Sequence, residues 1–226
     1  MDQINYIIPE LFLSISIMIL LMIGVFYKNS SNLIYQSSLV VLLISFFLIF
    51  TNPIDKSIFL FNNSIKIDYL SSLMKSITLI STFFVMLSSY DYVKTIGINK
   101  IEYPILILSS VLGMVIMIGS YDLMVFYIGL ELQSLALYVL VSFNVNNTRS
   151  SEAGLKYFIL SALSSGLLLY GCSLIYGFTG STNFDVIAFN LNNLNFGSIF
   201  GIVFILVGLA FKISAVPFHM WAPDVY

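Results

Sequence analysis

Seven apolar stretches, each about as long as a bilayer-spanning helix, set the strongest limit on how this chain can fold. A helix needs about 20 apolar residues to cross the hydrocarbon core of a membrane. The stretches are 7–27, 33–50, 69–89, 104–121, 122–142, 153–178 and 199–221. They predict an all-α, polytopic membrane protein with about seven transmembrane helices.

The composition supports lipid as the solvent for most of the chain. Of the 226 residues, 59% are hydrophobic and only 9% are charged. No single soluble core could bury this much apolar surface. The lipid bilayer is therefore an expected partner. The few charged residues, with a net charge of -2, form no basic patch, so nucleic acid is not expected as a partner.

The motifs of redox and metal enzymes are not found in the sequence. One cysteine, Cys172, excludes disulfides and thiolate metal clusters within the chain. No glycine-rich phosphate loop, Cys/His metal spacing or nucleophile–base arrangement occurs either. We therefore expect no metal site, no cofactor site and no redox chemistry in this chain itself.

Lys212 is the charge that is hardest to accommodate, because it ends a 13-residue apolar run, Ile199–Phe211. A charged amine at that depth costs roughly 3 kcal/mol on insertion scales, so it needs a partner or water. Pro217 removes a backbone donor and clashes with the preceding turn, which predicts that the last span is broken there. Broken helices border protein or water-filled cavities, where Lys212 would exchange a proton and His219 would titrate near neutral pH. The alternative is a merely kinked span with His219 at the membrane interface.

Glu131 and Lys156 form a second candidate site on a proton pathway. Glu131 lies midway along its span, where an acid usually lines an ion or proton route, although a neutral acid in a helix contact is the alternative. Lys156 lies near the start of the next span and could instead reach the interface as a snorkelling lysine. From the predicted span ends, the two residues differ in depth by roughly 10 Å at 1.5 Å per residue, which leaves their pairing open.

Other polar and small residues of the spans are expected to serve packing or the interface. Lys75 falls about one and a half turns into a serine-rich span, which we expect to face other helices more than lipid. Asp68, Asp122 and Asp224 lie at span ends and are expected at the interface, without a chemical role. Small residues in stretch 153–178 favour close helix packing in lipid; they are Ser161, Ala162, Ser165, Gly166, Gly171 and Gly177.

Four segments carry a resemblance to a known family. They are ELQSLALYVL (131–140), EAGLKYF (152–158), SSGLLLYG (164–171) and FKISAVPFHMWAPDVY (211–226). In order and spacing they resemble the antiporter-like membrane subunits of respiratory complex I, NADH-quinone oxidoreductase. Within that family they are most similar to the type called N in bacteria and 2 in mitochondria, rather than to types L and M.

The resemblance implies a proton-translocating membrane subunit of an enzyme that reduces quinone elsewhere in the complex. By motif position, Glu131 would be the glutamate that modulates its neighbouring lysine, Lys156 that lysine, and Lys212 the lysine of the broken span, with His219 continuing the polar axis. Other membrane subunits of complex I would be partners, and FMN and iron–sulfur clusters would be held elsewhere in the complex. A bacterial inner membrane is expected, with the mitochondrial inner membrane as the alternative.

The resemblance also implies a domain division and a missing half. Residues 1–100 would be three N-terminal helices, and 101–226 the first part of the proton-translocating repeat. Family members have about 14 spans in two inverted repeats, so this chain would stop before the second repeat. It would then be a fragment, a split-gene half completed by a second polypeptide, or an inactive truncated remnant. A subunit of a multi-subunit cation/proton antiporter, which shares the repeat, is the other functional alternative.

Overall fold

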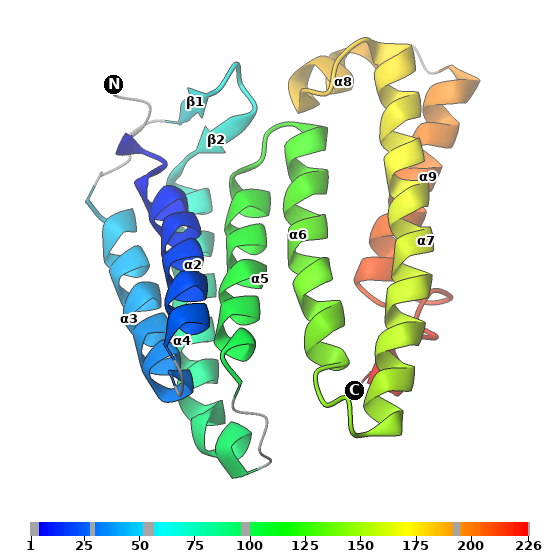
Figure 1. The fold of residues 1–226 in the computed structure, drawn as a ribbon. Helices are drawn as coiled ribbons and strands as arrows, with labels where there is room; N and C mark the ends of the chain where they lie inside the picture. The colour runs from blue at the N-terminus through cyan, green and yellow to red at the C-terminus, as the bar shows by residue number, and fades with distance from the viewer. Residues whose placement is uncertain (1–4, 28–29, 52–56, 96–99, 192–194, 226) are drawn as a thin grey trace. The chain divides into compact units, whose positions relative to one another are not determined.

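A computed structural model describes residues 5–27, 30–51, 57–95, 100–191 and 195–225 (Figure 1). The chain divides into two compact units. The first unit comprises Met1–Ser120 and Ile128–Leu140, and the second comprises Tyr121–Tyr127 and Val141–Tyr226. The two units are defined by which residues pack together. The boundary predicted at residue 100 is of another kind, the start of the family's repeat, and it stays a prediction.

Within the described residues, six helices are long and apolar enough to cross a membrane. They are α2 (Ile8–Phe26), α3 (Ser31–Ile49), α4 (Tyr69–Thr95), α5 (Glu102–Gly119), α6 (Leu123–Val141) and α7 (Thr148–Thr179). A shorter apolar helix, α9 (Phe196–Lys212), corresponds to the seventh predicted span. The predicted all-α membrane fold is therefore confirmed, and the chain is an integral membrane protein.

Four helices of the first unit, α2 to α5, enclose one apolar core. Leu13 from α2, Leu42 from α3, Leu79 from α4 and Leu108 from α5 are almost wholly buried together. Tyr35 is also fully buried in this core, and its hydroxyl donates a hydrogen bond of 2.5 Å to the carbonyl of Met86. That bond satisfies the phenol, which would otherwise cost free energy to bury.

A small β-hairpin, absent from the sequence prediction, covers one end of the first unit. Strand β1 (Ile58–Leu60) pairs antiparallel with β2 (Ile65–Ile67). The four-residue connection, 61–64, places Phe61, Asn62 and Asn63 at φ of 50°, 53° and 64°, the left-handed conformation that asparagine tolerates. Leu60 and Ile67 bury their side chains against Ile7, the residue just before the first long helix, Ile8–Phe26.

The second unit is built on close packing of α7 against α9. A Cβ added to Gly171 in α7 would lie 2.8 Å from the carbonyl oxygen of Gly201 in α9, so the backbones touch where both residues are glycine. Gly166 and Gly177 of the same helix have no atom within 4 Å of such a Cβ. The predicted packing role of small residues therefore holds at Gly171 but not at these two.

The ends of the helices in the second unit are fixed by caps. The side chain of Asn147 accepts a hydrogen bond from the backbone of Arg149 and starts α7 five residues earlier than predicted. Gly180, at φ 74°, ends α7 in the left-handed conformation. A short helix, α8 (Phe184–Asn190), follows. The predicted loop at 190–195 includes residues 192–194, which lie outside the described residues.

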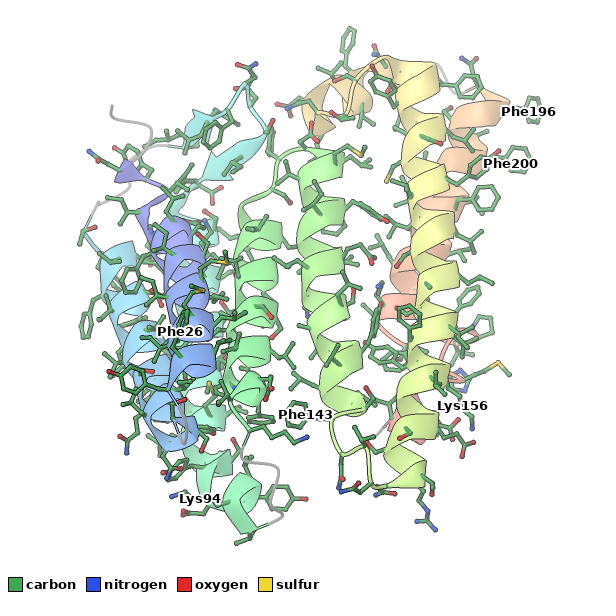
Figure 2. All side chains as sticks on the ribbon, viewed as in Figure 1. Phe26, Lys94, Phe143, Lys156, Phe196 and Phe200 are labelled. Atoms are coloured by element: carbon green, nitrogen blue, oxygen red, sulfur yellow. The ribbon has the colours of Figure 1, made fainter. Side chains whose placement is uncertain are left out.

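Helix α6 contributes residues to both units. Ile128–Leu140 belongs to the first unit, where α6 packs closely on α5: a Cβ on Gly113 would lie 2.6 Å from the backbone nitrogen of Gln133. The turn predicted at Gly119–Asp122 separates α5 from α6. The outward faces of the helices carry large apolar side chains suited to lipid, such as Phe196 and Phe200 on α9 (Figure 2).

Candidate functional site

Lys212 is the last residue of α9 and is only partly exposed. Its ammonium donates a hydrogen bond of 3.1 Å to the hydroxyl of Ser161 in α7. Ser161 is completely buried. The sequence suggested Ser161 only as a small packing residue, so this polar partner for Lys212 was missed.

The break after Lys212 is made by a helix-ending motif rather than by Pro217. The amide of Ser214 donates to the carbonyl of Phe211, and the amide of Ala215 donates to that of Ala210. This pair of bonds, with Ser214 at φ 55°, is a Schellman motif in which serine occupies the position that usually belongs to glycine. The predicted position of the break, at Pro217, is therefore five residues too late.

The segment after the break folds back onto α7 and α9 through an aromatic anchor. Trp221 is 4% exposed, its ring stacks on Tyr157 with centroids 4.4 Å apart, and its indole nitrogen donates to the carbonyl of Phe211 at 3.1 Å. His219 precedes this anchor in the non-helical segment and is exposed. Lys212 and His219 are thus not two turns apart on one helix, because the helix has ended at Lys212.

Lys156 is half-exposed and makes two ion pairs within the second unit. Its Nζ lies 2.8 Å from Glu152, one turn earlier on α7, and 3.1 Å from Asp224 in the short helix α10 (Ala222–Val225). The side chain extends from the first half of α7 (Figure 2). Asp224 was expected to have no role beyond the interface, so its bond to Lys156 was missed.

Glu131 lies in the middle of α6 and is partly buried. Ser134, one turn on, is buried and donates to the carbonyls of Leu130 and Glu131. Glu131 belongs to the first unit, whereas Lys156 and Lys212 belong to the second. Its predicted pairing with Lys156 therefore stays a prediction.

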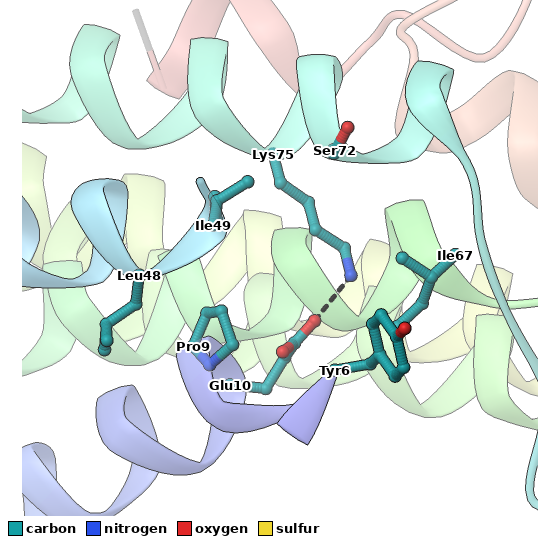
Figure 3. A pocket seen from close by; sticks show the side chains of 8 residues that line it. All are labelled: Tyr6, Pro9, Glu10, Leu48, Ile49, Ile67, Ser72 and Lys75. Atoms are coloured by element: carbon teal, nitrogen blue, oxygen red, sulfur yellow. Dashed lines mark hydrogen bonds and ion pairs between the residues drawn. The ribbon is translucent and has the colours of Figure 1, made fainter. Parts of the chain in front are cut away.

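Sequence reasoning also missed a buried ion pair in the first unit. Lys75 in α4 is 4% exposed, and its Nζ lies 2.5 Å from Oε1 of Glu10 in α2 (Figure 3). Lys75 was expected only to face other helices, and Glu10 was not singled out. The available signal was one acid and one base, each within the first two turns of an apolar span.

Comparisons with known proteins agree with the resemblance read from the motifs. The family of NADH:quinone oxidoreductase/Mrp antiporter transmembrane proteins matches residues 120–226. The whole chain is 64% identical to NADH-quinone oxidoreductase subunit N of Pelagibacter ubique, and 99% of it is 50% identical to subunit N of Bartonella bacilliformis. The second half of the chain is therefore similar to this family, and the whole chain is similar to subunit N. It covers 48% and 46% of those two relatives, so it spans about half of their length.

Solved structures of respiratory membrane complexes contain chains with the same fold. A chain of respiratory complex I from Thermus thermophilus, 25% identical, superposes with a TM-score of 0.79 over 96% of this chain and 47% of its own length. A chain of an archaeal membrane-bound sulfane sulfur reductase, 24% identical, gives a TM-score of 0.80 over 99% of this chain and 47% of its own. The bacterial relatives and the membrane spans together assign the chain to a bacterial inner membrane.

Proposed function

We propose that this chain is part of a proton-translocating membrane subunit of NADH:quinone oxidoreductase. Lys212 would be a proton carrier, Lys156 and Glu131 a pair on the pathway, and His219 a residue that continues its polar axis. The contact between Lys212 and Ser161 carries the proposal. A hydroxyl accepts a hydrogen bond from an ammonium and donates one to a neutral amine, so this contact persists in both protonation states of Lys212.

The end of α9 supplies the rest of the argument. Lys212 lies where the helix stops and a non-helical segment begins, and such segments at membrane depth border protein or water. Charge at a helix C-terminus is favoured when positive, so the amine is held there without needing a full ion pair.

The pairing of Glu131 with Lys156 is part of the proposal and rests on the positions of each residue in its own helix. Glu131 lies ten residues, about 15 Å, before the end of α6, and Lys156 lies eight residues, about 12 Å, after the start of α7. In the second unit Asp224 and Glu152 already contact Lys156, so Glu131 would compete with them for the ammonium.

The relatives are about twice as long as this chain, and we propose that translocation requires the remaining half of the subunit, in the same or a second polypeptide. Other membrane subunits of the enzyme would be its partners. FMN and iron–sulfur clusters would be carried by those other parts of the complex.

The deciding experiment measures proton pumping and NADH oxidation in membranes containing the intact enzyme. Lys212→Ala should reduce NADH-driven proton uptake at least several-fold, and Lys212→Arg, which keeps a charge that does not titrate, should reduce it as well. Lys94→Ala is the matched control, because Lys94 is an exposed lysine in the last turn of α4. Wild-type pumping in Lys212→Ala would refute the assignment.

A second candidate function is a cation/proton antiporter subunit. A chain of the Mrp complex of Dietzia shares the fold with a TM-score of 0.71 at 20% identity, and the matching family includes Mrp antiporters. Purification of the tagged chain discriminates between the two. Recovery of NADH dehydrogenase subunits supports the first function, and recovery of other antiporter chains supports the second.

A further inference from the structure

The ion pair of Glu10 and Lys75 lies outside the four residues of the proposed pathway and is buried. Lys75 is 4% exposed, and the Glu10 side chain is 13% exposed. Removing two charges from water is unfavourable, and their mutual attraction offsets that penalty only with good geometry and further polar partners. The groups that surround each charge therefore indicate the role of the ion pair.

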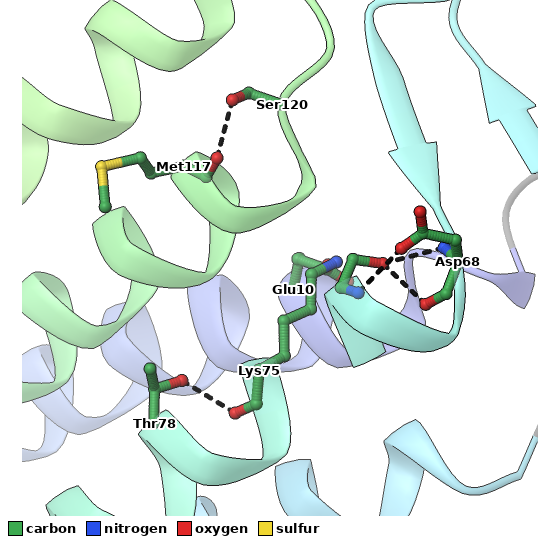
Figure 4. Close-up of polar contacts among 7 residues, drawn as sticks. Glu10, Asp68, Lys75, Thr78, Met117 and Ser120 are labelled. Carbon is green, nitrogen blue, oxygen red and sulfur yellow. Dashed lines mark hydrogen bonds and ion pairs between the residues drawn. The ribbon is translucent and has the colours of Figure 1, made fainter. Parts of the chain in front are cut away.

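Each charge is placed at the helix end that favours it. Glu10 is in the first turn of α2, where the positive end of the helix dipole stabilises a carboxylate. The ammonium of Lys75 approaches the last residue of α5, since a Cβ added to Gly119 would lie 3.1 Å from its Nζ. The negative end of α5 thus faces the ammonium (Figure 4). These contacts stabilise the ammonium of Lys75 and one carboxylate oxygen of Glu10, Oε1.

The other oxygen of Glu10, Oε2, is buried and has no hydrogen-bond partner among the described residues. A cavity of about 20 Å³ adjoins the pair, and its lining includes Tyr6, Pro9, Ile67 and Ser72 (Figure 3). A water molecule needs about 10–15 Å³ measured in this way, so the cavity accommodates one. A buried carboxylate oxygen without a hydrogen-bond partner destabilises the fold, and a bound water would offset that loss.

Both charged residues also lie near the first residues of their helices. Glu10 is the third residue of α2 and Lys75 the seventh of α4, which places them about 3 Å and 9 Å along their helices from the ends. Ile67 of the hairpin is one of the residues that line the cavity. A proton would have a short path between bulk water and the carboxylate.

We propose that Glu10 and Lys75 form a hydrated proton-exchange site, in which a water in the cavity bonds to Oε2 of Glu10. A hydronium ion reaching that water transfers its proton to Oε2, which yields a neutral carboxylic acid and one water. Lys75 stays an ammonium throughout, so the site changes from zero to one positive charge. On release the new O–H bond breaks and the proton returns to water. This site extends the proposed proton-translocating function and rests on it.

The test compares three variants in membranes that contain the intact enzyme, with the amount of assembled complex, uncoupled NADH oxidation and NADH-driven proton pumping measured for each. Glu10→Gln keeps a hydrogen-bond acceptor for Lys75 but cannot take up a proton. We expect assembly and oxidation within about 2-fold of wild type and pumping reduced several-fold. Lys75→Met leaves the acid without its cation and should lower assembly. The double variant should restore assembly but not pumping.

Three outcomes separate this proposal from its alternatives. If pumping in Glu10→Gln equals wild type while Lys212→Ala pumps poorly, the exchange site is refuted and the proposed function stands. If Glu10→Gln lowers assembly and pumping in parallel and the double variant restores both, the pair is only a structural clamp and the proposal is overturned. If Lys212→Ala pumps normally, the proposed pathway fails whatever Glu10→Gln does.

Discussion

The contact of α7 with α9 predicts that two alanine substitutions in one helix have opposite effects on stability. In Gly171→Ala the new methyl would lie 2.8 Å from the carbonyl oxygen of Gly201 and 2.9 Å from the backbone nitrogen of Ile205. Both obstacles are backbone atoms, so the helices must separate. In Gly166→Ala the methyl has no atom within 4 Å and only removes the conformational freedom of glycine.

The expected magnitudes follow from these contacts. Forcing a methyl into a filled interface costs about 1–3 kcal/mol, and replacing a helical glycine by alanine returns about 0.5–1 kcal/mol. Gly171→Ala should therefore lose about 1–2 kcal/mol, and Gly166→Ala should gain up to about 1 kcal/mol. For a chain of this size, 1 kcal/mol shifts the Tm by about 2–4 °C. We expect a fall of about 2–8 °C in the first variant and a rise of up to about 4 °C in the second.

The single cysteine provides the assay. Cys172 is 3% exposed in α7, so a thiol-reactive dye should label the detergent-solubilised chain only when this helix pair opens. Labelling against temperature gives the Tm of each variant. Gly177→Ala, which is equally open, should behave like Gly166→Ala. Equal shifts in Gly171→Ala and Gly166→Ala would refute the close-packing argument.

Three further predictions concern polar contacts and helix ends. The backbone hydrogen bond from Ser71 lowers the pKa of Asp68, so its stabilisation is present above the ordinary pKa of about 3.9 and lost as pH falls through the lowered value. Asp68→Ala should cost about 1 kcal/mol by thermal unfolding near neutral pH, whereas Asp68→Asn should keep the hydrogen bond from Ser71 and lose the acid dependence. Ser214→Gly should raise the Tm, since serine at positive φ costs about 1–2 kcal/mol; a lower Tm would contradict the Schellman assignment. Asp224→Asn should change the rate of NADH-driven proton pumping, because Lys156 would lose one of its two carboxylate partners. An unchanged rate would mean that this ion pair is only a surface contact.

The spans were predictable because their signal is local. Runs of apolar residues predicted each long helix, and most observed helix bounds differ from the predicted ones by only a few residues. The largest differences are the ends of α9, nine residues early, and α4, six residues late. Helix α7 starts five residues early, because Asn147 caps it ahead of the polar residues Arg149 and Glu152. A hydropathy reading omits those residues, although they extend the same helix.

The site was less predictable because its contacts join residues far apart in sequence. Lys212 was correctly singled out as an expensive charge, yet its partner Ser161 is 51 residues away and resembles any small helix residue. The break was expected at Pro217, because proline is a strong local signal, whereas the Schellman motif at Ser214 uses a residue without one. The role of Glu131 depends on its position relative to Lys156, and sequence alone does not give it.

The separation of Glu10 and Lys75 has a consequence for biogenesis. The two residues are 65 positions apart, so the first span enters the membrane before its counter-ion has been synthesised. Because the acid is in the first turn of α2, it can remain among the lipid headgroups until the third span arrives. Loss of the lysine should then leave membrane insertion intact and arrest the later docking of helices.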